Sequence, residues 1–353
     1  MRIDAIRAWA FDAPLTRPYA ISGGSWDSVE MAFVALRTDA GVEGFGMASP
    51  ATEVTGETRA DSLRELEGAG WLASRDAGDT ALLAELESRV LGPAARSALD
   101  MALCDLIAKK QNLPLAELFS RKHASMPTSV TIGVKPVVET LAEAREYVGR
   151  GFTALKVKVG ASLEEDIDRL TFLRIEFGDS ITVRADANQG YSERDLVEFL
   201  DETQDLGIEM IEQPLPPGHE GFLRTLPLSA QRLLCADESV HDEAALARLV
   251  AEGCPYGIVN VKLQKCGGPR AALRIARMCH EHGLGIMWGC NDESALGIAA
   301  ALHTAFACDA TRFLDLDGSL DLAKDAFSGG FTIRNGRMST MLRTGLGCEL
   351  EQG

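Results

Sequence analysis

Short apolar runs alternate with amphipathic segments over most of the chain beyond residue 125. The runs cover residues 129–134, 154–159, 181–186, 207–212, 233–237, 257–262, 283–288 and 312–317. Most segments between them place apolar residues at helical spacing, as in "SERDLVEFLDETQDL". Strands that are apolar along their whole length are typical of parallel sheets covered on both faces. The pattern therefore predicts an α/β fold of the (β/α)8, or TIM-type, barrel class.

The first third of the chain follows a different pattern. "RIDAIRAWAFDAPL" and "EMAFVALRTDAGVEGFGMAS" predict antiparallel strands, and "ARSALDMALCDLIAKKQNL" predicts a long helix. We expect an α+β capping domain over residues 1–122, a catalytic barrel over 123–317, and a C-terminal segment, 318–353, that packs back on the capping domain. The polar loops 21–28 and 48–57 of the capping domain are long enough to reach the barrel mouth.

Composition and charge exclude some classes of partner. The formal net charge of −17 opposes binding to nucleic acid or to an anionic membrane surface. No apolar run approaches the roughly 20 residues that a membrane span needs. The 8 cysteines contain no C-x-x-C pair, which favours a reducing compartment, and we expect a cytoplasmic protein.

Acidic residues end three successive predicted strands. Asp186, Glu212 and Asp237 take these positions, and Lys262 ends the next strand. In barrel enzymes the chemistry lies at the carboxyl ends of the strands, so these side chains should share one rim. One charge at a strand end is commonly a helix cap, but three converging carboxylates repel one another and need a cation. Oxygen ligands indicate a hard ion, Mg²⁺ first and Mn²⁺ as the alternative.

Two lysines lie in one of the apolar runs, "ALKVKV". Side chains two apart on a strand point to the same face, so Lys156 and Lys158 should enter the barrel together. Lys262 would approach from the far side of the metal. Two lysines facing each other across a metal-bound carboxylate can remove a proton from one face of a carbon and return one to the other. The alternative is an exposed edge strand with basic tips.

These segments resemble a known family. The runs "KVKVG", "RADANQGY", "IEQPL", "ADES" and "NVKLQKCGG" are similar to the enolase superfamily, in its muconate-lactonizing-enzyme subgroup. The resemblance implies that Asp186, Glu212 and Asp237 bind the metal. It also implies that Lys158 and Lys262 are the acid/base pair, that Lys156 is a partner of the substrate carboxylate, and that the protein is a homo-oligomer.

The last predicted strand narrows the resemblance. "RFLDLDGSLDL" is similar to dipeptide epimerases, in which the Asp-x-Asp pair, here Asp315 and Asp317, holds the substrate's α-ammonium group. Thr131 matches a family substrate contact. The resemblance thus implies an isomerase, a Mg²⁺-dependent epimerase that acts on an L,L-dipeptide by 1,1-proton transfer through an enolate.

The sequence departs from relatives that act on dipeptides ending in glutamate. Gly24 falls where those relatives carry an arginine, and Asn291 and Asp292, in "GCNDES", replace apolar residues at the expected side-chain pocket. Together with Asp27 and Glu53 in the capping loops, Asp292 would make the pocket acidic. We therefore expect a polar or basic second residue rather than glutamate, unless these acids only contribute to the overall negative charge.

Other functions remain open on the same residues. A cycloisomerase, an o-succinylbenzoate synthase or an N-acylamino acid racemase would use the same lysines and metal, and Asp315 and Asp317 discriminate against them. A Schiff-base lyase barrel would need one buried lysine and no carboxylate cluster. A non-catalytic scaffold barrel would not need both Lys158 and Lys262.

Overall fold

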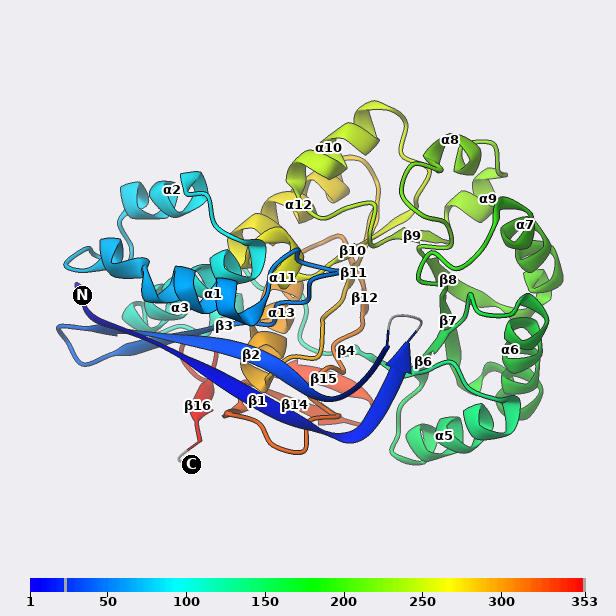
Figure 1. The fold of residues 1–353 in the computed structure, drawn as a ribbon, viewed down its shortest axis with the longest axis horizontal. Helices are drawn as coiled ribbons and strands as arrows, with labels where there is room; N and C mark the ends of the chain where they lie inside the picture. The colour runs from blue at the N-terminus through cyan, green and yellow to red at the C-terminus, as the bar shows by residue number, and fades with distance from the viewer. Residues whose placement is uncertain (22–23, 352–353) are drawn as a thin grey trace.

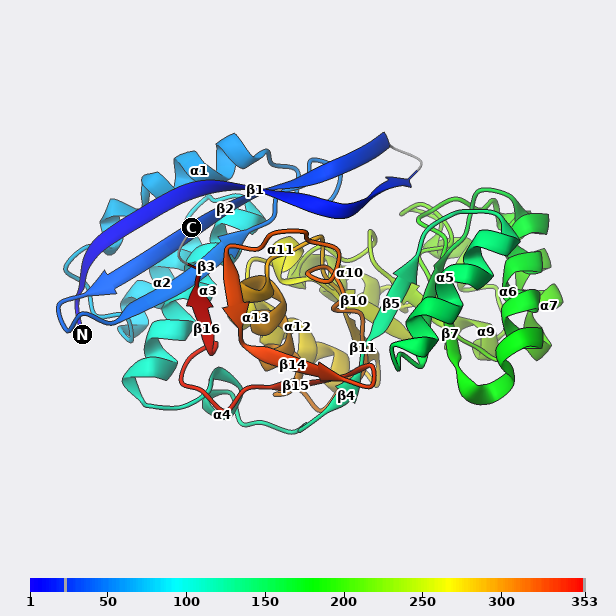
Figure 2. The same ribbon diagram turned by 90° about the horizontal axis from the view of Figure 1, so that it is seen from below.

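The computed structural model describes residues 1–21 and 24–351. It describes the side chains of residues 1–16 and 27–351. An antiparallel sheet opens the chain, with β1 (Ile3–Ile21), β2 (Gly24–Thr38) and β3 (Glu43–Ala48) in that order. Figures 1 and 2 show β1 and β2 extending from this sheet toward the barrel. The predicted loop 21–28 falls partly on residues 22–23, which lie outside the described residues.

Helices cover the sheet of the capping domain. Their bounds are α1 (Arg59–Glu67), η1 (Ala69–Leu72), α2 (Thr80–Ser88), α3 (Pro93–Lys110) and α4 (Leu115–Leu118). The long helix α3 lies directly against β3. Gly44 and Gly46 allow this close approach, because a Cβ at either position would collide with the backbone of α3. The beginning of the loop after β3 is therefore held firmly to the helix layer.

Eight parallel strands form the second sheet. They are β5 (Ser129–Ile132), β6 (Ala154–Lys158), β7 (Thr182–Asp186), β8 (Ile208–Glu212), β9 (Leu234–Ala236), β10 (Ile258–Val261), β11 (Gly285–Trp288) and β12 (Thr311–Leu314). They neighbour one another in chain order, and a parallel bridge between Thr128 and Leu314 joins the last strand to the first. Seven of the eight apolar runs contain one strand each, and the run 312–317 overlaps β12, which begins one residue earlier, so the predicted TIM-type barrel is confirmed.

Helices surround the barrel strands (Figure 1). Their bounds are α5 (Val137–Gly149), α6 (Leu163–Phe177), η2 (Gly178–Ser180), α7 (Glu193–Glu202), η3 (Gln204–Leu206), α8 (Glu220–Leu223), α9 (Leu228–Gln231), α10 (Glu243–Ala251), α11 (Leu263–Cys266), α12 (Pro269–Glu281) and α13 (Ala295–Ala305). The proline-rich link after β8 carries only the one-turn helices α8 and α9. The short helix α11 begins directly after Lys262 and packs on α3 of the capping domain.

The C-terminal segment returns to the capping domain (Figure 2). Its strands are β13 (Phe327–Gly329), β14 (Phe331–Arg334), β15 (Arg337–Thr340) and β16 (Cys348–Leu350), and β15 pairs with β4 (Met126–Pro127). The backbone of Gly345 bonds to Leu113 and Leu115, and the Leu346 amide donates to the Asp105 carboxylate on α3 at 2.8 Å. These contacts agree with the predicted return of residues 318–353, while the domain boundaries themselves stay a prediction.

Within the described residues, no helix combines the length and the apolar character that crossing a bilayer requires.

Candidate active site

The order of the barrel strands places two lysines on opposite sides of the mouth. Lys158 ends β6, and Lys262 follows β10 directly. In a ring of eight strands in chain order, β6 and β10 are four places apart and therefore face each other. The ends of β7, β8 and β9 occupy the arc between them, and those of β11, β12 and β5 complete the ring.

The strand register brings acids and lysines to one level. Lys158 pairs with Asp186 across β6 and β7, and Asp186 pairs with Glu212 across β7 and β8. Lys158 Nζ lies 2.7 Å from both Asp186 Oδ2 and Asn188 Oδ1. Glu212 is fully buried, so the strand ends form one compact polar layer.

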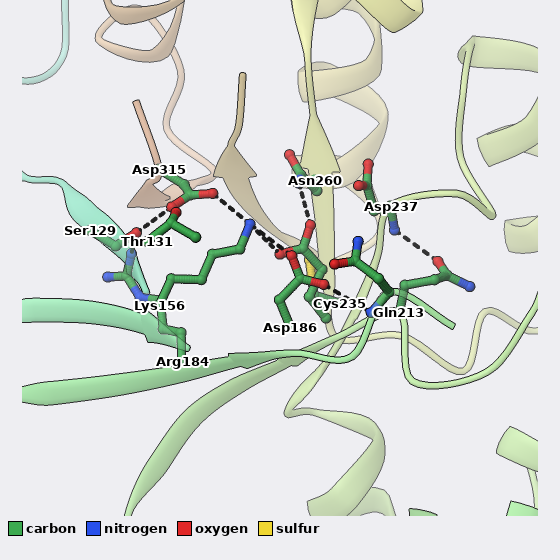
Figure 3. A network of polar contacts seen from close by, with 12 residues as sticks. Ser129, Thr131, Lys156, Arg184, Asp186, Gln213, Cys235, Asp237, Asn260 and Asp315 are labelled. Atoms are coloured by element: carbon green, nitrogen blue, oxygen red, sulfur yellow. Dashed lines mark hydrogen bonds and ion pairs between the residues drawn. The ribbon is translucent and has the colours of Figure 1, made fainter. Parts of the chain in front are cut away.

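Lys156 points to the same face as Lys158, as predicted from the spacing on the strand. Its ammonium group bridges three carboxylates (Figure 3). Nζ lies 3.0 Å from Asp186 Oδ2, 2.9 Å from Glu212 Oε2 and 2.7 Å from Asp315 Oδ2. Lys156 thus joins the carboxylates after β7 and β8 to the acidic residue after β12.

Asp237 is held by two lysines. Lys262 Nζ lies 2.9 Å from Asp237 Oδ2, and the ammonium group of Lys265 contacts Oδ1. Lys265 also donates to the Asp237 carbonyl at 2.8 Å, and it is buried. Lys265 therefore fixes the position of Asp237, whereas Lys262 is the lysine that remains partly accessible at the mouth.

Burial and neighbouring charges shift these groups in opposite directions. Burial and the adjacent Asp186 raise the pKa of Glu212 to about 8. Burial also acts on Asp237, but Lys262 and Lys265 outweigh it and lower the pKa of that carboxyl well below its usual range. Although burial favours the neutral amine of Lys262, Asp237 and Glu212 raise its pKa. Glu212 therefore holds a proton more strongly than an ordinary carboxyl group, whereas Asp237 stays ionised between two lysines.

The three acids fit a hard divalent cation. Among the described residues, no three His, Cys, Asp or Glu side chains are already arranged as a metal site. Two of the acids nevertheless converge on one cationic centre, because Lys156 Nζ lies within 3.0 Å of Asp186 and 2.9 Å of Glu212. Asp237 adds a third carboxylate from the next strand, and the donors are all oxygen atoms, which Mg²⁺ prefers.

The opposite arc of the mouth carries the remaining predicted residues. Asp315 accepts from Ser129 Oγ at 2.6 Å in addition to its contact with Lys156. Asp317 accepts from the Thr131 backbone amide at 2.7 Å. Burial and the nearby Asp315 raise the pKa of Asp317 to about 7. Of the two aspartates, Asp317 is therefore the one whose charge a bound cation would stabilise most.

The expected pocket residues Asn291 and Asp292 meet the capping domain. Asn291 Nδ2 donates to the Ser49 carbonyl at 3.0 Å, and Ser49 Oγ donates to the Asp292 carbonyl at 2.8 Å. The side-chain amide of Asn291 is thus hydrogen-bonded to the loop that follows β3. The sequence did not indicate this contact. Asp27 and Glu53 are exposed.

Several residues that shape the site were missed from sequence. Asn260, inside β10, donates to Glu212 Oε1 at 2.6 Å (Figure 3). Gln213 accepts from the Asp237 amide at 2.9 Å, and Arg184 donates to Ser129 Oγ at 3.1 Å. Asn260 and Gln213 lie inside the motifs "NVKLQK" and "IEQPL", near the predicted site residues Lys262 and Glu212, and this proximity was the only available signal.

A barrel with opposed lysines beside three strand-end carboxylates defines a class of enzymes that remove and return a proton next to a carboxylate. Residues 5–120 match the family described as mandelate racemase / muconate lactonizing enzyme, N-terminal domain, and residues 139–353 match the enolase C-terminal domain-like family. The chain belongs to the mandelate racemase/muconate lactonizing enzyme family of the enolase superfamily, which confirms the predicted membership.

Relatives match along nearly the whole chain. An L-Lys-D/L-Arg epimerase of Methylococcus capsulatus is 47% identical over 98% of this chain and 99% of its own. An enzyme of the same name from Desulforapulum autotrophicum is 46% identical over the same shares. A crystal structure of the dipeptide epimerase from Methylococcus capsulatus, complexed with Mg and the dipeptide L-Arg-D-Lys, superposes with a TM-score of 0.96 at 47% identity, covering 99% of each chain.

Proposed function

We propose that the protein is a Mg²⁺-dependent dipeptide epimerase that inverts the α-carbon of the C-terminal residue of an L,L-dipeptide and favours basic residues. The observation that carries the proposal is the pair Lys158 and Lys262 on opposite sides of a carboxylate layer, with Asp317 on the remaining arc. The predicted class of enzyme, an isomerase of dipeptides, agrees with relatives that are themselves dipeptide epimerases.

In this proposal Asp186, Glu212 and Asp237 hold the cation. When bound, the cation supplies positive charge that stabilises negative charge developing on the substrate and lowers the pKa of neighbouring ammonium groups. Asn260 orients Glu212 through its bond to Oε1, and Lys265 orients Asp237. The other oxygens of the two carboxylates contact the ammonium groups of Lys156 and Lys262.

The protein's own residues carry the proton. A substrate carboxylate placed against the metal layer presents its α-carbon between Lys158 and Lys262. One lysine, as the free amine, accepts the α-proton from one face, and the other, as ammonium, donates a proton to the opposite face. Lys156 lies below them and contacts Asp186, Glu212 and Asp315. We propose that Lys156 also faces the substrate carboxylate, as the family resemblance implies.

Asp317 and Asp315 would then bind the α-ammonium group of the first residue. Asp317 is better placed for this role, because Asp315 is already paired with Lys156 and bonded to Ser129. Thr131 would act through its backbone amide, which orients Asp317. A dicarboxylate such as muconate would be repelled by these two acids, which disfavours the cycloisomerase alternative.

An acidic pocket would explain a preference for basic side chains. Asp292 lies at the mouth beside Asn291, and Glu53 and Asp27 lie in the capping domain. Two relatives that are 47% and 46% identical over 98% of the chain are epimerases named for lysine and arginine. Coulombic attraction to these carboxylates would favour lysine or arginine over glutamate in the substrate.

The proposal is tested by proton NMR in D₂O. We expect L-Lys-L-Arg incubated with enzyme and Mg²⁺ to lose one α-proton signal while the epimer appears, and EDTA to abolish both changes. L-Ala-L-Glu and L-Leu-L-Tyr at equal concentrations should react at least about tenfold more slowly, which is the value of roughly 1.4 kcal/mol of favourable charge pairing. A preference for the glutamate dipeptide would contradict the specificity, and no exchange in any dipeptide would contradict the reaction.

We further propose that the protein is a cytoplasmic homo-oligomer. All eight cysteines are free thiols in the structure, as expected in a reducing compartment. Light scattering of the purified protein would measure its oligomeric state directly, and a monomer mass at assay concentrations would contradict that part of the proposal.

A further inference from the structure

A buried polar network joins the capping domain to the barrel mouth. We name the residues Ser49, Gln264, Asn291 and Glu293 the mouth clamp. The Ser49 amide donates to Gln264 Oε1 at 3.1 Å, and Gln264 Nε2 donates to Glu293 Oε2 at 3.1 Å. Glu293 Oε1 accepts from the Asn291 amide at 3.0 Å, and Asn291 Nδ2 donates back to the Ser49 carbonyl at 3.0 Å. The four residues thus form a closed ring of hydrogen bonds.

The sequence makes room for this ring. Glu293 is 2% exposed and Gln264 is fully buried, so neither side chain has water as an alternative partner. Gly297, in the first turn of α13, lies against the Glu293 carboxylate, and a Cβ there would collide with Oε2. Glycine inside a helix costs stability relative to alanine, and here it provides the space for the carboxylate.

The ring permits only one orientation of the Gln264 amide. The Ser49 N–H is a donor, so it must face the amide oxygen, and the Gln264 NH₂ group then faces Glu293. Glu293 in turn faces two donors, Gln264 Nε2 and the Asn291 amide, which only a pair of acceptor oxygens satisfies. With glutamine at position 264, both oxygens at position 293 must accept, so the ring pairs one amide with one carboxylate.

The ring can act on either of two neighbours, the catalytic lysine or the capping loop. Gln264 lies two residues after Lys262, but Lys262 has its own anchor in Asp237 at 2.9 Å. Ser49 makes three hydrogen bonds to the barrel, and among the described residues none joins positions 50–56 to it. Glu57 accepts from Ser62 Oγ at 3.0 Å inside the capping domain. Breaking the ring should therefore loosen the capping loop more than it displaces Lys262.

We propose that Glu293 is a positioning residue for substrate specificity: through Gln264 and Asn291 it seats the capping loop 49–57 on the barrel mouth before substrate binds. The inference rests on the proposed epimerase function for its kinetic consequence. A loop seated in advance reduces the ordering cost of binding. Loss of Glu293 should therefore raise KM and weaken the preference for basic dipeptides, while the turnover of bound substrate is largely kept.

The test uses an exchange of amide and carboxylate. In Glu293→Gln, one of the two donors facing residue 293 meets an NH₂ group, and one hydrogen bond of the ring is lost. In Gln264→Glu, two carboxylates face each other. In the double variant Q264E/E293Q, the carboxylate introduced at position 264 accepts from the Ser49 amide and from the NH₂ group introduced at position 293. The amide oxygen at position 293 then accepts from the Asn291 amide, so the whole ring is restored.

We expect KM of Glu293→Gln for L-Lys-L-Arg to rise about tenfold, the size of one lost buried hydrogen bond, with kcat within about threefold of wild type. Hydrogen–deuterium exchange of the peptide 47–57 should speed up in both single variants. The double variant should return both KM and exchange toward the wild-type values. Glu281→Gln, at the exposed end of α12, is the matched control and should change neither.

Three results would overturn the inference. These are unchanged KM and exchange in Glu293→Gln, a fall in kcat at constant KM, or a double variant no better than the single ones. Should a buried single variant fail to fold, Asn291→Ala, at a partly exposed position, removes the other bond to Ser49 and must speed exchange of the same peptide. If the wild type epimerises no dipeptide, the exchange measurements alone decide whether the clamp seats the loop.

Discussion

The ionisation of Asp317 gives the sharpest prediction for substrate binding. Burial and Asp315 raise the pKa of Asp317 to about 7, so its carboxylate loses its charge as the pH falls through neutrality. A neutral carboxyl group attracts the α-ammonium group of a dipeptide much less than a carboxylate does. KM for a dipeptide should therefore rise as the pH is lowered, in proportion to the fraction of Asp317 that is protonated.

The size of the effect follows from the pKa. With a pKa of about 7, the ionised fraction falls from about three quarters at pH 7.5 to about one tenth at pH 6, so KM should rise about eightfold. Above about pH 7.7 the α-amino group of the substrate itself loses its proton, which limits the useful range. At pH 7.5 about a quarter to four tenths of the substrate is already uncharged, so the change in KM of the wild type alone combines both titrations and needs a reference variant.

Asp317→Asn separates this ionisation from others in the site. The asparagine keeps an oxygen for the Thr131 amide but carries no charge at any pH. The ratio of KM for Asp317→Asn to KM for wild type cancels titrations that both enzymes share. We expect that ratio to fall about eightfold between pH 7.5 and pH 6. A ratio that stays constant over this range would refute the assignment of Asp317 as the ammonium ligand.

Three further predictions address the lysines, the metal and the fold. Lys158→Ala and Lys262→Ala should each epimerise the dipeptide about 10²–10⁴-fold more slowly. Each variant should still exchange the α-proton of one epimer, and the two variants should act on opposite epimers. Exchange of both epimers by either variant would contradict lysines on opposite sides of the substrate. Mg²⁺ should raise the melting temperature of the EDTA-treated protein and restore its activity, and an unchanged melting temperature contradicts a metal site. Asp105→Ala removes the acceptor for the Phe45 and Leu346 amides. Urea titrations should show a free energy of unfolding lower by about 2–5 kcal/mol. A change below about 0.5 kcal/mol would mean that Asp105 does not hold the C-terminal segment.

The barrel and most of the charged layer could be predicted from the sequence, because both follow from patterns that repeat over a few residues. Each apolar run contains or overlaps a strand, and Asp186 and Glu212 end their strands as predicted. The inward direction of Lys156 and Lys158 follows from the alternation of side chains along a strand. These patterns are local, so they can be interpreted without knowing which helices and strands contact one another in the fold.

Contacts between distant segments were not predictable in the same way. Ser49, Gln264 and Glu293 come together only when the capping domain lies on the barrel, and no spacing in the sequence relates them. The contact of Lys156 with Asp315 joins residues 159 positions apart. Asn291 was expected at the substrate, but its amide bonds to Ser49, because the direction of a side chain in a loop depends on partners that the loop sequence does not contain.

The arrangement of charge around the ring separates chemistry from recognition. The arc from β6 to β10 carries Lys158, the three carboxylates and Lys262, and Asn260 and Lys265 of the same arc bond to two of these carboxylates. The arc of β11, β12 and β5 carries the acids proposed to bind the substrate's ammonium group. Asp317 bonds to the Thr131 amide on its own arc, so a change there should disturb the first arc less than a change at Asp315, which contacts Lys156.

Lys156 is the link between the two arcs. It contacts Asp186 and Glu212 on one side and Asp315 on the other, at 2.7 to 3.0 Å. In the proposed mode of binding, Asp315 is already paired with Lys156, whereas the Asp317 carboxylate makes no ion pair with the described residues. We therefore expect selection for a free amino terminus to rest mainly on Asp317, because the lysine that links the two arcs occupies Asp315.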